Sequence, residues 1–283
     1  MAPTRVPPIL VLAAGALAAR AALTAVRRSP VNTSLERANF RGRTVTLAGG
    51  PALAAAASVA AAAGAPSGPA AAAALTAGLT SGAVGLYDDV VGSRPEQKAA
   101  KGFAGHLRAL RRGQVTSGLV KIAGVGAAGL AASALLALDR PGRKTRWGTL
   151  ADVALGAGVI AGTANLVNLL DLRPGRAIKA SALIGAPLLP TSAGGLAAGA
   201  VGAAAGLLPQ DLDEQIMLGD SGANALGALL GVAIAATCGP IGRAVVFAGL
   251  AGLTAASEKV SFTAVIQRTP GLRELDELGR RQS

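Results

Sequence analysis

Long apolar stretches alternate with short polar segments along the whole chain. The nine apolar segments run over residues 7–26, 46–64, 69–87, 115–138, 148–166, 177–190, 193–209, 222–238 and 241–257. Most approach the roughly 20 residues that a helix needs to cross a bilayer, and Pro and Gly turns separate them. The pattern predicts an all-α, polytopic membrane bundle of about nine transmembrane helices. Residues 1–283 would form one membrane domain, with residues 258–283 as a cytoplasmic tail.

The composition supports a bundle in lipid over a soluble core. Hydrophobic residues make up 51% of the chain, charged residues 15% and aromatic residues 2%, whereas soluble proteins carry about 25% charged residues. Small apolar residues cannot fill a large water-soluble core, but in lipid they let helix backbones approach closely. The single cysteine, Cys238, excludes an intramolecular disulfide.

The basic residues predict the orientation. The chain carries a net charge of +12, and most of its Arg and Lys residues fall in the loops 27–45, 88–114 and 167–176 and in the tail, which lie on the same side as the loop 210–221 in the predicted span order. Because basic loops stay in the cytoplasm, we expect these segments on the cytoplasmic side of the plasma membrane and the N-terminus on the outer side. The distribution among loops argues against a nucleic-acid-binding surface, since no single soluble domain holds the charge.

Three polar motifs fall at the cytoplasmic ends of predicted spans. Asp88 and Asp89 follow the third span, and two adjacent carboxylates need a cation such as Mg²⁺ nearby. Asn165, Asn168 and Asp171 recur every three residues at the end of the fifth span, along one helix stripe. The alternatives are a solvated helix end for the pair, and helix-to-helix hydrogen bonding for the carboxamides.

The third motif is GDSG, where Asp220 precedes the eighth span. Its carboxylate could bind a metal ion while the free N–H groups of the helix start bind phosphate. The alternative is a helix cap formed by Asp220 or Ser221. The acidic residues just upstream, Asp211, Asp213 and Glu214, are expected in a solvated loop.

Several basic side chains could face phosphates at such a site. Lys101, His106 and Arg108 share the loop that follows the Asp pair, and the residues alone do not decide among them. Lys121, about two turns into the fourth span, either snorkels to the surface or points into the site. His106 is the only histidine, which excludes a multi-histidine zinc site.

Taken in order, YDDVVG, NLVNLLD and GDSGANALG resemble the motifs of the polyprenyl-phosphate N-acetylhexosamine-1-phosphate transferases. TVTLAGG (residues 44–50) resembles the segment before that family's second span, so the likeness covers roughly residues 40–235. The chain lacks the histidine-rich segment that many members carry in their last cytoplasmic loop.

The resemblance implies transfer of a sugar-1-phosphate from a UDP-sugar to a membrane polyprenyl phosphate, with Mg²⁺. Asp220, with Asn168, would bind the metal. Asp88 and Asp89 would position the metal complex and the attacking phosphate, and Asp171 would help bind the nucleotide-sugar. Asn165 and one of Lys101, His106 and Arg108 would contact substrate. The residues leave the sugar, the pathway and a homodimer open.

Two other functions fit parts of the sequence. The missing histidine-rich segment would suit a family member that has kept the fold and lost its catalytic activity. The strip of Asn165, Asn168 and Asp171 would suit an ion path in a small transporter, but such a path needs polar groups at mid-membrane depth. The span count puts these residues at one edge, which favours the transferase.

Overall fold

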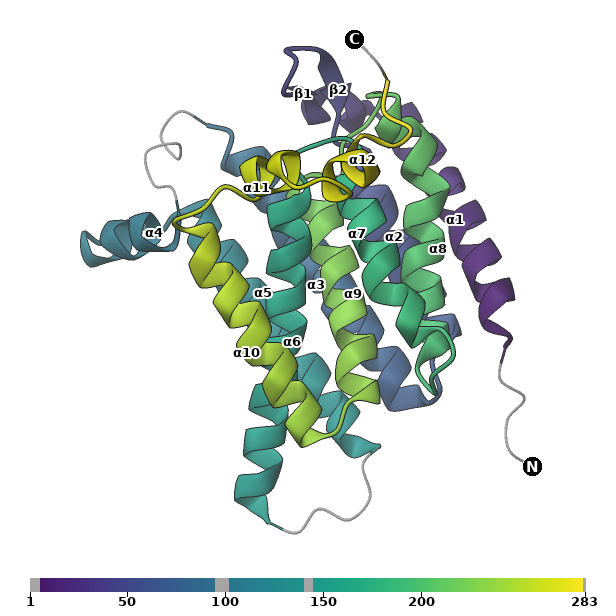
Figure 1. Cartoon of the computed structure of the whole chain (residues 1–283), viewed down its shortest axis with the longest axis vertical. Helices are drawn as coiled ribbons and strands as arrows, with labels where there is room; N and C mark the ends of the chain where they lie inside the picture. Colours follow the sequence, from purple (N-terminus) through teal and green to yellow (C-terminus); the bar gives the residue numbers. More distant parts are fainter. Residues whose placement is uncertain (1–5, 95–101, 140–144, 282–283) are drawn as a thin grey trace.

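A computed structural model describes residues 6–94, 102–139 and 145–281, and this part of the chain is mostly helical, with 77% helix and 3% strand (Figure 1). The helices are α1 (Pro8–Arg28), α2 (Gly49–Ala63), α3 (Gly68–Val91), α4 (Gly102–Arg111), α5 (Ser117–Leu138), α6 (Arg146–Leu170), α7 (Arg176–Gly185), α8 (Gly194–Leu212), α9 (Gly219–Thr237), α10 (Pro240–Ser257), α11 (Phe262–Arg268) and α12 (Leu272–Glu277). Short 3₁₀ turns, η1 (Pro30–Leu35) and η3 (Ala186–Leu188), follow α1 and α7.

Each of the nine apolar segments forms a helix, but the count of nine spans is not confirmed. Among the described residues, five helices are long and apolar enough to cross a membrane: α1, α3, α5, α6 and α10. α7 has only 10 residues and ends at Gly185, where η3 and its proline begin. Ten helical residues rise about 15 Å, which is half of the bilayer's hydrocarbon core.

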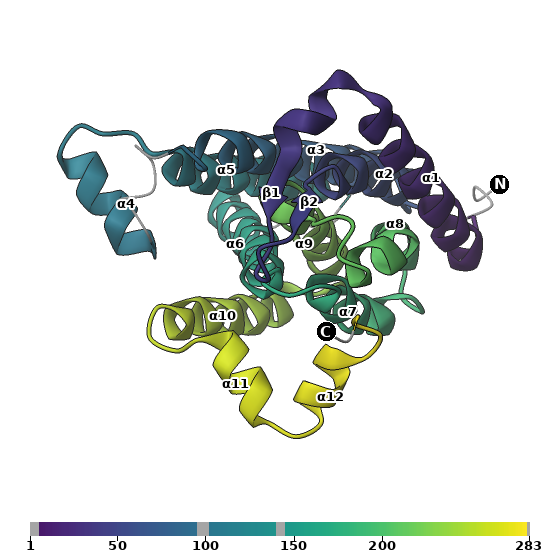
Figure 2. The ribbon, with the colours of Figure 1, turned by 90° about the horizontal axis from the view of Figure 1, so that it is seen from above.

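α9 forms the centre of the bundle. Nearly all of its residues from Ser221 to Ala233 are buried, and α2, α3, α6 and α8 surround it when the molecule is viewed from above (Figure 2). Small side chains make this packing possible. A Cβ atom at Gly85 of α3 would lie 2.3 Å from the Asp220 carbonyl oxygen. The glycine therefore lets the end of α3 touch the start of α9, where two of the polar motifs meet.

Several elements lie in segments that the hydropathy pattern left as loops or tail. β1 (Glu36–Ala38) and β2 (Thr44–Thr46) form an antiparallel hairpin in which Glu36 pairs with Thr46 and Ala38 with Thr44. The hairpin reaches the loop before α9, because the Met217 N–H donates to the Thr46 carbonyl at 2.9 Å. α4, α11 and α12 are the other additions, and all lie near the same end of the bundle in Figure 1.

The C-terminal segment is fastened to the bundle. Arg176, the first residue of α7, donates to both carboxylate oxygens of Asp276 in α12, at 2.7 and 2.9 Å. The side chains of both residues are buried. Lys179, one turn further along α7, donates to the backbone carbonyls of Leu275, Asp276 and Leu278. These bonds hold α12 across the turn between α6 and α7.

Candidate active site at one end of the bundle

The three polar motifs meet around Lys121. Its ammonium nitrogen lies 2.7 Å from Asp88 Oδ2 and 2.5 Å from Asp220 Oδ2. Asn168 donates its side-chain N–H to the other oxygen of Asp220, at 2.5 Å. α3, α5, α6 and α9 each contribute one of these four residues. The cluster therefore depends on the packing of four helices that are far apart in sequence.

Asp89 has a different position from its neighbour Asp88. Its two carboxylate oxygens accept the backbone N–H groups of Asp220 and Ser221, each at 3.0 Å. The first N–H groups of a helix have no partner within the helix, and a carboxylate there also interacts favourably with the helix dipole. Asp89 is therefore the cap of α9. The alternative of a local cap from Asp220 or Ser221 is wrong, because a carboxylate from α3 binds these N–H groups.

The turn that begins α9 requires a glycine. Gly219 has φ +59°, a left-handed conformation that side chains disfavour. A Cβ atom there would also lie 2.9 Å from both carboxylate oxygens of Asp89. The first glycine of the GDSG motif thus allows the close approach of Asp89 to the helix start.

Asp171 follows the last turn of α6 and faces the same cluster. Burial raises the pKa of its carboxyl well above the usual range, and the charges of Asp211, Asp220 and Asp89 act in the same direction. A hydrogen bond from the Gly219 backbone N–H opposes the shift. A carboxyl in these surroundings favours its protonated form, or a cation beside it.

A cavity of about 600 Å³ opens over these residues. This is the size of a typical small-molecule site. Its polar lining comes from all three motifs, from the hairpin, from α4, from the segment after α3 and from the start of α5: Arg37, Asp88, Asp89, Ser93, His106, Ser117, Asn168, Asp171 and Asp220. The cavity therefore offers both acidic and basic groups to a polar ligand.

A second cavity, of about 650 Å³, adjoins the first. Its walls are mostly apolar side chains of α5, α6 and α10, including Ile122, Leu169 and Phe247. Three residues, His106, Gly118 and Asn168, line both cavities, and Lys121 lines the second. A polar chamber and an apolar groove thus meet at the acidic cluster.

Of the remaining predicted substrate contacts, Asn165 and His106 line a cavity and Arg108 does not. Asn165 donates to Thr254 Oγ1 of α10 at 3.0 Å and lines the apolar groove, away from the carboxylates. His106 Nδ1 lies 2.8 Å from Thr116 Oγ1, at the junction of the cavities. Arg108 is exposed and lines neither cavity. Lys101 lies outside the described residues.

Among the described residues, the cation that touches the carboxylates is Lys121. The sequence left its direction open between the membrane surface and the site. The signal in the sequence was a lysine inside a predicted apolar span, because a charge there needs a partner.

The expectation of a solvated loop at Asp211 and Glu214 is wrong, whereas Asp213 is exposed as expected. Asp211 accepts the Gly175 backbone N–H at 2.7 Å. Glu214 accepts from the Asn39 side chain at 2.7 Å and pairs with Arg41 at 3.2 Å. Both acids are buried because they join the end of α8 to other segments of this face.

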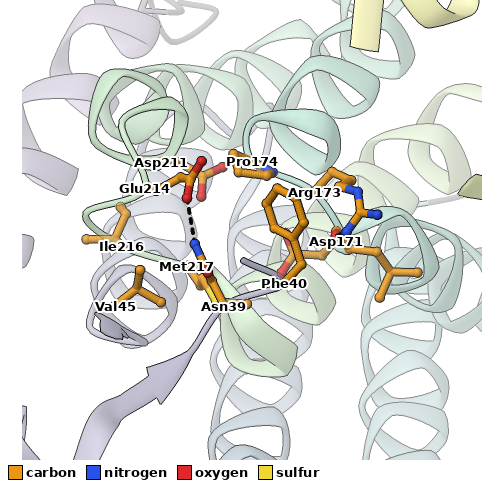
Figure 3. Close-up of a pocket in the computed structure, with 11 residues that line it drawn as sticks. Asn39, Phe40, Val45, Asp171, Arg173, Pro174, Asp211, Glu214, Ile216 and Met217 are labelled. Carbon is orange, nitrogen blue, oxygen red and sulfur yellow. Dashed lines mark hydrogen bonds between the residues drawn. The ribbon is translucent and has the colours of Figure 1, made fainter. Parts of the chain in front are cut away.

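These contacts surround a small pocket of about 40 Å³ beside Asp171 (Figure 3). Figure 3 shows the Phe40 ring beside Arg173, whose guanidinium carbon lies 4.1 Å from the ring centroid. This distance is typical of a cation–π interaction. The hairpin loop and the turn after α6 are thereby held together at the edge of the larger polar cavity.

The cluster suits a hard cation such as Mg²⁺. Asp88 and Asp220 supply carboxylate oxygens. The side-chain amide of Asn168 now donates its N–H to Asp220, and a flip of this amide would turn its oxygen toward the cluster instead. Within the described part of the chain, no three His, Cys, Asp or Glu side chains are arranged to hold a metal. Mg²⁺ is commonly bound by one or two carboxylates together with substrate phosphates, so the donors present fit the ion.

The sequence matches no known family model and no curated protein at a significant level. The case for a function therefore rests on the geometry of the site and on the motifs that build it.

Proposed function

We propose that the protein is a membrane transferase that moves a sugar-1-phosphate from a UDP-sugar to a polyprenyl phosphate. The observation that carries the proposal is the meeting of a polar cavity and an apolar groove at Asp88, Lys121 and Asp220. One substrate of such a reaction is water-soluble and the other has a long apolar chain. The polar cavity suits the first, and the apolar groove suits the second.

The membrane placement is part of the proposal. The nine apolar helices would lie in the plasma membrane, with the acidic cluster at the cytoplasmic side where the loops are basic. α7, too short to cross, would be half-embedded. A site at the membrane surface is what the two substrates require, because they approach from different phases.

The chemistry is a phosphoryl transfer that needs charge neutralisation and alignment. An oxygen of the lipid phosphate forms a bond to the β-phosphorus of the UDP-sugar, the bond from that phosphorus to the bridging oxygen breaks, and UMP leaves. Bound Mg²⁺ would neutralise the pyrophosphate. Asp88, Asp220 and Asn168 would hold the ion.

Other residues of the chain would position the substrates. Lys121 lines the apolar groove beside Asp88 and Asp220 and would bind a phosphate oxygen. Asp89, by capping α9, would keep Asp220 in place without contacting the reacting atoms. Asp171 lies at the edge of the polar cavity, where it would contact the nucleotide-sugar. An N-acetylhexosamine is the proposed sugar, from the resemblance of the motifs.

The test is UMP release by the purified protein, with a panel of UDP-sugars, polyprenyl phosphate and Mg²⁺. We expect turnover with at least one UDP-N-acetylhexosamine. Asp220→Asn should lower it by at least about 100-fold, or about 2.7 kcal/mol of barrier, because an amide lacks the charge that Mg²⁺ requires.

Asp213→Asn is the matched control, since it makes the same change at an exposed residue that lines neither cavity. It should retain normal turnover. Equal losses in both variants would contradict the metal assignment. Absence of UMP release with every UDP-sugar, from a protein that stays folded, would instead indicate a member of this fold without transferase activity.

A further inference from the structure

α4 stands apart from the rest of the bundle. Figure 1 shows it lying crosswise to the long helices, and Figure 2 shows it projecting to the side beyond α5. Its main packing partner among the described elements is α5, where His106 lies against Thr116 and Gly118 at the start of that helix. Such a short helix is marginal by itself in water, so a surface that covers it would stabilise it.

The sequence of α4 is that of an amphipathic helix. Its sequence, GFAGHLRALR, places apolar residues at positions 103, 107 and 110, the spacing of one helix face. Arg108, Arg111 and Arg112 are exposed, and none of the three pairs with a carboxylate in the part of the chain that the structure describes. Leu110 and Val115 are exposed too, at 43% and 63%.

We propose that α4 is an interfacial helix that docks on the anionic phospholipid headgroups of the membrane. The inference rests on the proposed membrane placement and orientation but does not depend on transferase activity. The charge is complementary, because three arginines face an anionic surface. The position also fits, since α5 enters the bundle at Ser117, five residues after Arg112, and this holds α4 at the level of the headgroups. Basic helices with an apolar face bind at this depth.

Docking of α4 would position His106, which comes from the same helix. A Cβ atom at Gly118 would lie 2.4 Å from the His106 ring, so the ring rests directly on the start of α5. Its Nδ1 atom lies 2.8 Å from the Thr116 hydroxyl. His106 lines both cavities. Anionic lipid would therefore hold one wall of the junction between them.

The experiment measures the depth of α4 in nanodiscs that contain the full-length protein. Cys238→Ser removes the native thiol, and Leu110→Cys carries a fluorophore that acyl-brominated lipids quench. We compare discs of phosphatidylcholine alone with discs that also contain phosphatidylglycerol. Quenching should be at least about twofold stronger with phosphatidylglycerol and should weaken at high salt, because exposed charges are screened.

The test variant combines Arg108→Gln, Arg111→Gln and Arg112→Gln. It should lose the dependence of quenching on phosphatidylglycerol. The matched control combines Arg43→Gln, Arg268→Gln and Arg273→Gln, three exposed arginines outside α4, and should keep it. Equal quenching in both kinds of disc, or an unchanged response in the α4 variant, would overturn the proposal. The quenching measurement does not require turnover, so its result is independent of the transferase assay.

Discussion

Lys121 enters the acidic cluster from α5 and contacts a carboxylate on either side. The side chains are largely enclosed, with exposed fractions of 19% for Lys121, 12% for Asp88 and 26% for Asp220. Charges removed from water are tolerated only when they are paired. The lysine therefore holds together two carboxylates that would otherwise repel each other, and it does so where a divalent cation could bind them.

Lys121→Met is the test of this arrangement. Methionine keeps an unbranched chain but leaves the two carboxylates without their partner, so we expect a loss of about 1–3 kcal/mol of stability. Mg²⁺ should restore part of the loss, because it can bind the freed carboxylates. The measurement is thermal unfolding in detergent with and without Mg²⁺.

Lys259→Met is the control, since Lys259 is exposed in the segment after α10. It should unfold like the wild type in both conditions. If Mg²⁺ raised the unfolding temperature of Lys121→Met no more than that of the wild type, the carboxylates would not be a cation site.

Among the elements, α11 and α12 most clearly extend the bundle beyond its apolar helices. Asp276 joins them to it, accepting from Arg176 of α7 and from Arg280 in the next turn of the tail. Arg280 also donates to the Pro174 carbonyl at 3.0 Å. The turn between α6 and α7 carries Asp171 at its start, so the docked tail supports the edge of the polar cavity.

Low pH should release α12 from the bundle. Burial by itself raises the pKa of Asp276, but the hydrogen bonds and charges of Arg176 and Arg280 outweigh it and lower the pKa below its ordinary value. The ionised form is thus favoured in the folded state. Its stabilisation is fully present above the unfolded value of about 3.9 and is lost as the pH falls through the lowered folded value.

Hydrogen exchange of the α12 amides, corrected for intrinsic rates, measures the release. Asp276→Asn should raise exchange at pH 7 by roughly 100-fold, because it leaves the buried Arg176 guanidinium without its counter-ion. Glu277→Gln, at the exposed neighbouring residue, should change little. Protection that stayed the same in Asp276→Asn would show that the ion pair does not hold the tail.

At the scale of the whole molecule, all the polar motifs gather at one end of a bundle of small residues. At the other end, the turn between α9 and α10 consists of Cys238 and Gly239 alone. A single end rich in functional groups would suit the proposed transferase, which meets its soluble substrate on one side of the membrane only.

Cysteine labelling can test the orientation. In the Cys238→Ser background, a membrane-impermeant maleimide should label Gly239→Cys in intact spheroplasts. It should reach Gln114→Cys and Ser283→Cys only after permeabilisation, because those positions are expected in the cytoplasm. Gln114 and Gly239 are both exposed. Labelling of Gln114→Cys in intact spheroplasts would place the acidic cluster outside and contradict the proposed access of a cytoplasmic UDP-sugar.

The amino-acid sequence alone determined the nine apolar helices and the residue types of the site. Hydropathy is enough to predict these helices, because a backbone in lipid must satisfy its hydrogen bonds within each helix. Every apolar segment is helical in the structure. The polar motifs were visible because carboxylates and carboxamides are costly at the ends of such helices. The short helix α7 shows the limit of hydropathy, since α7 ends at Gly185 although the apolar segment continues to residue 190.

Only the tertiary structure decided which groups pair. Asp89 caps α9 from a position 131 residues earlier in the chain, and Lys121 joins acids from two other helices. Arg176 pairs with Asp276, which lies 100 residues later in the chain. No local periodicity encodes such pairs, because they depend on how closely whole helices approach. That approach is set by small residues such as Gly85, whose effect appears only when the facing backbone is known.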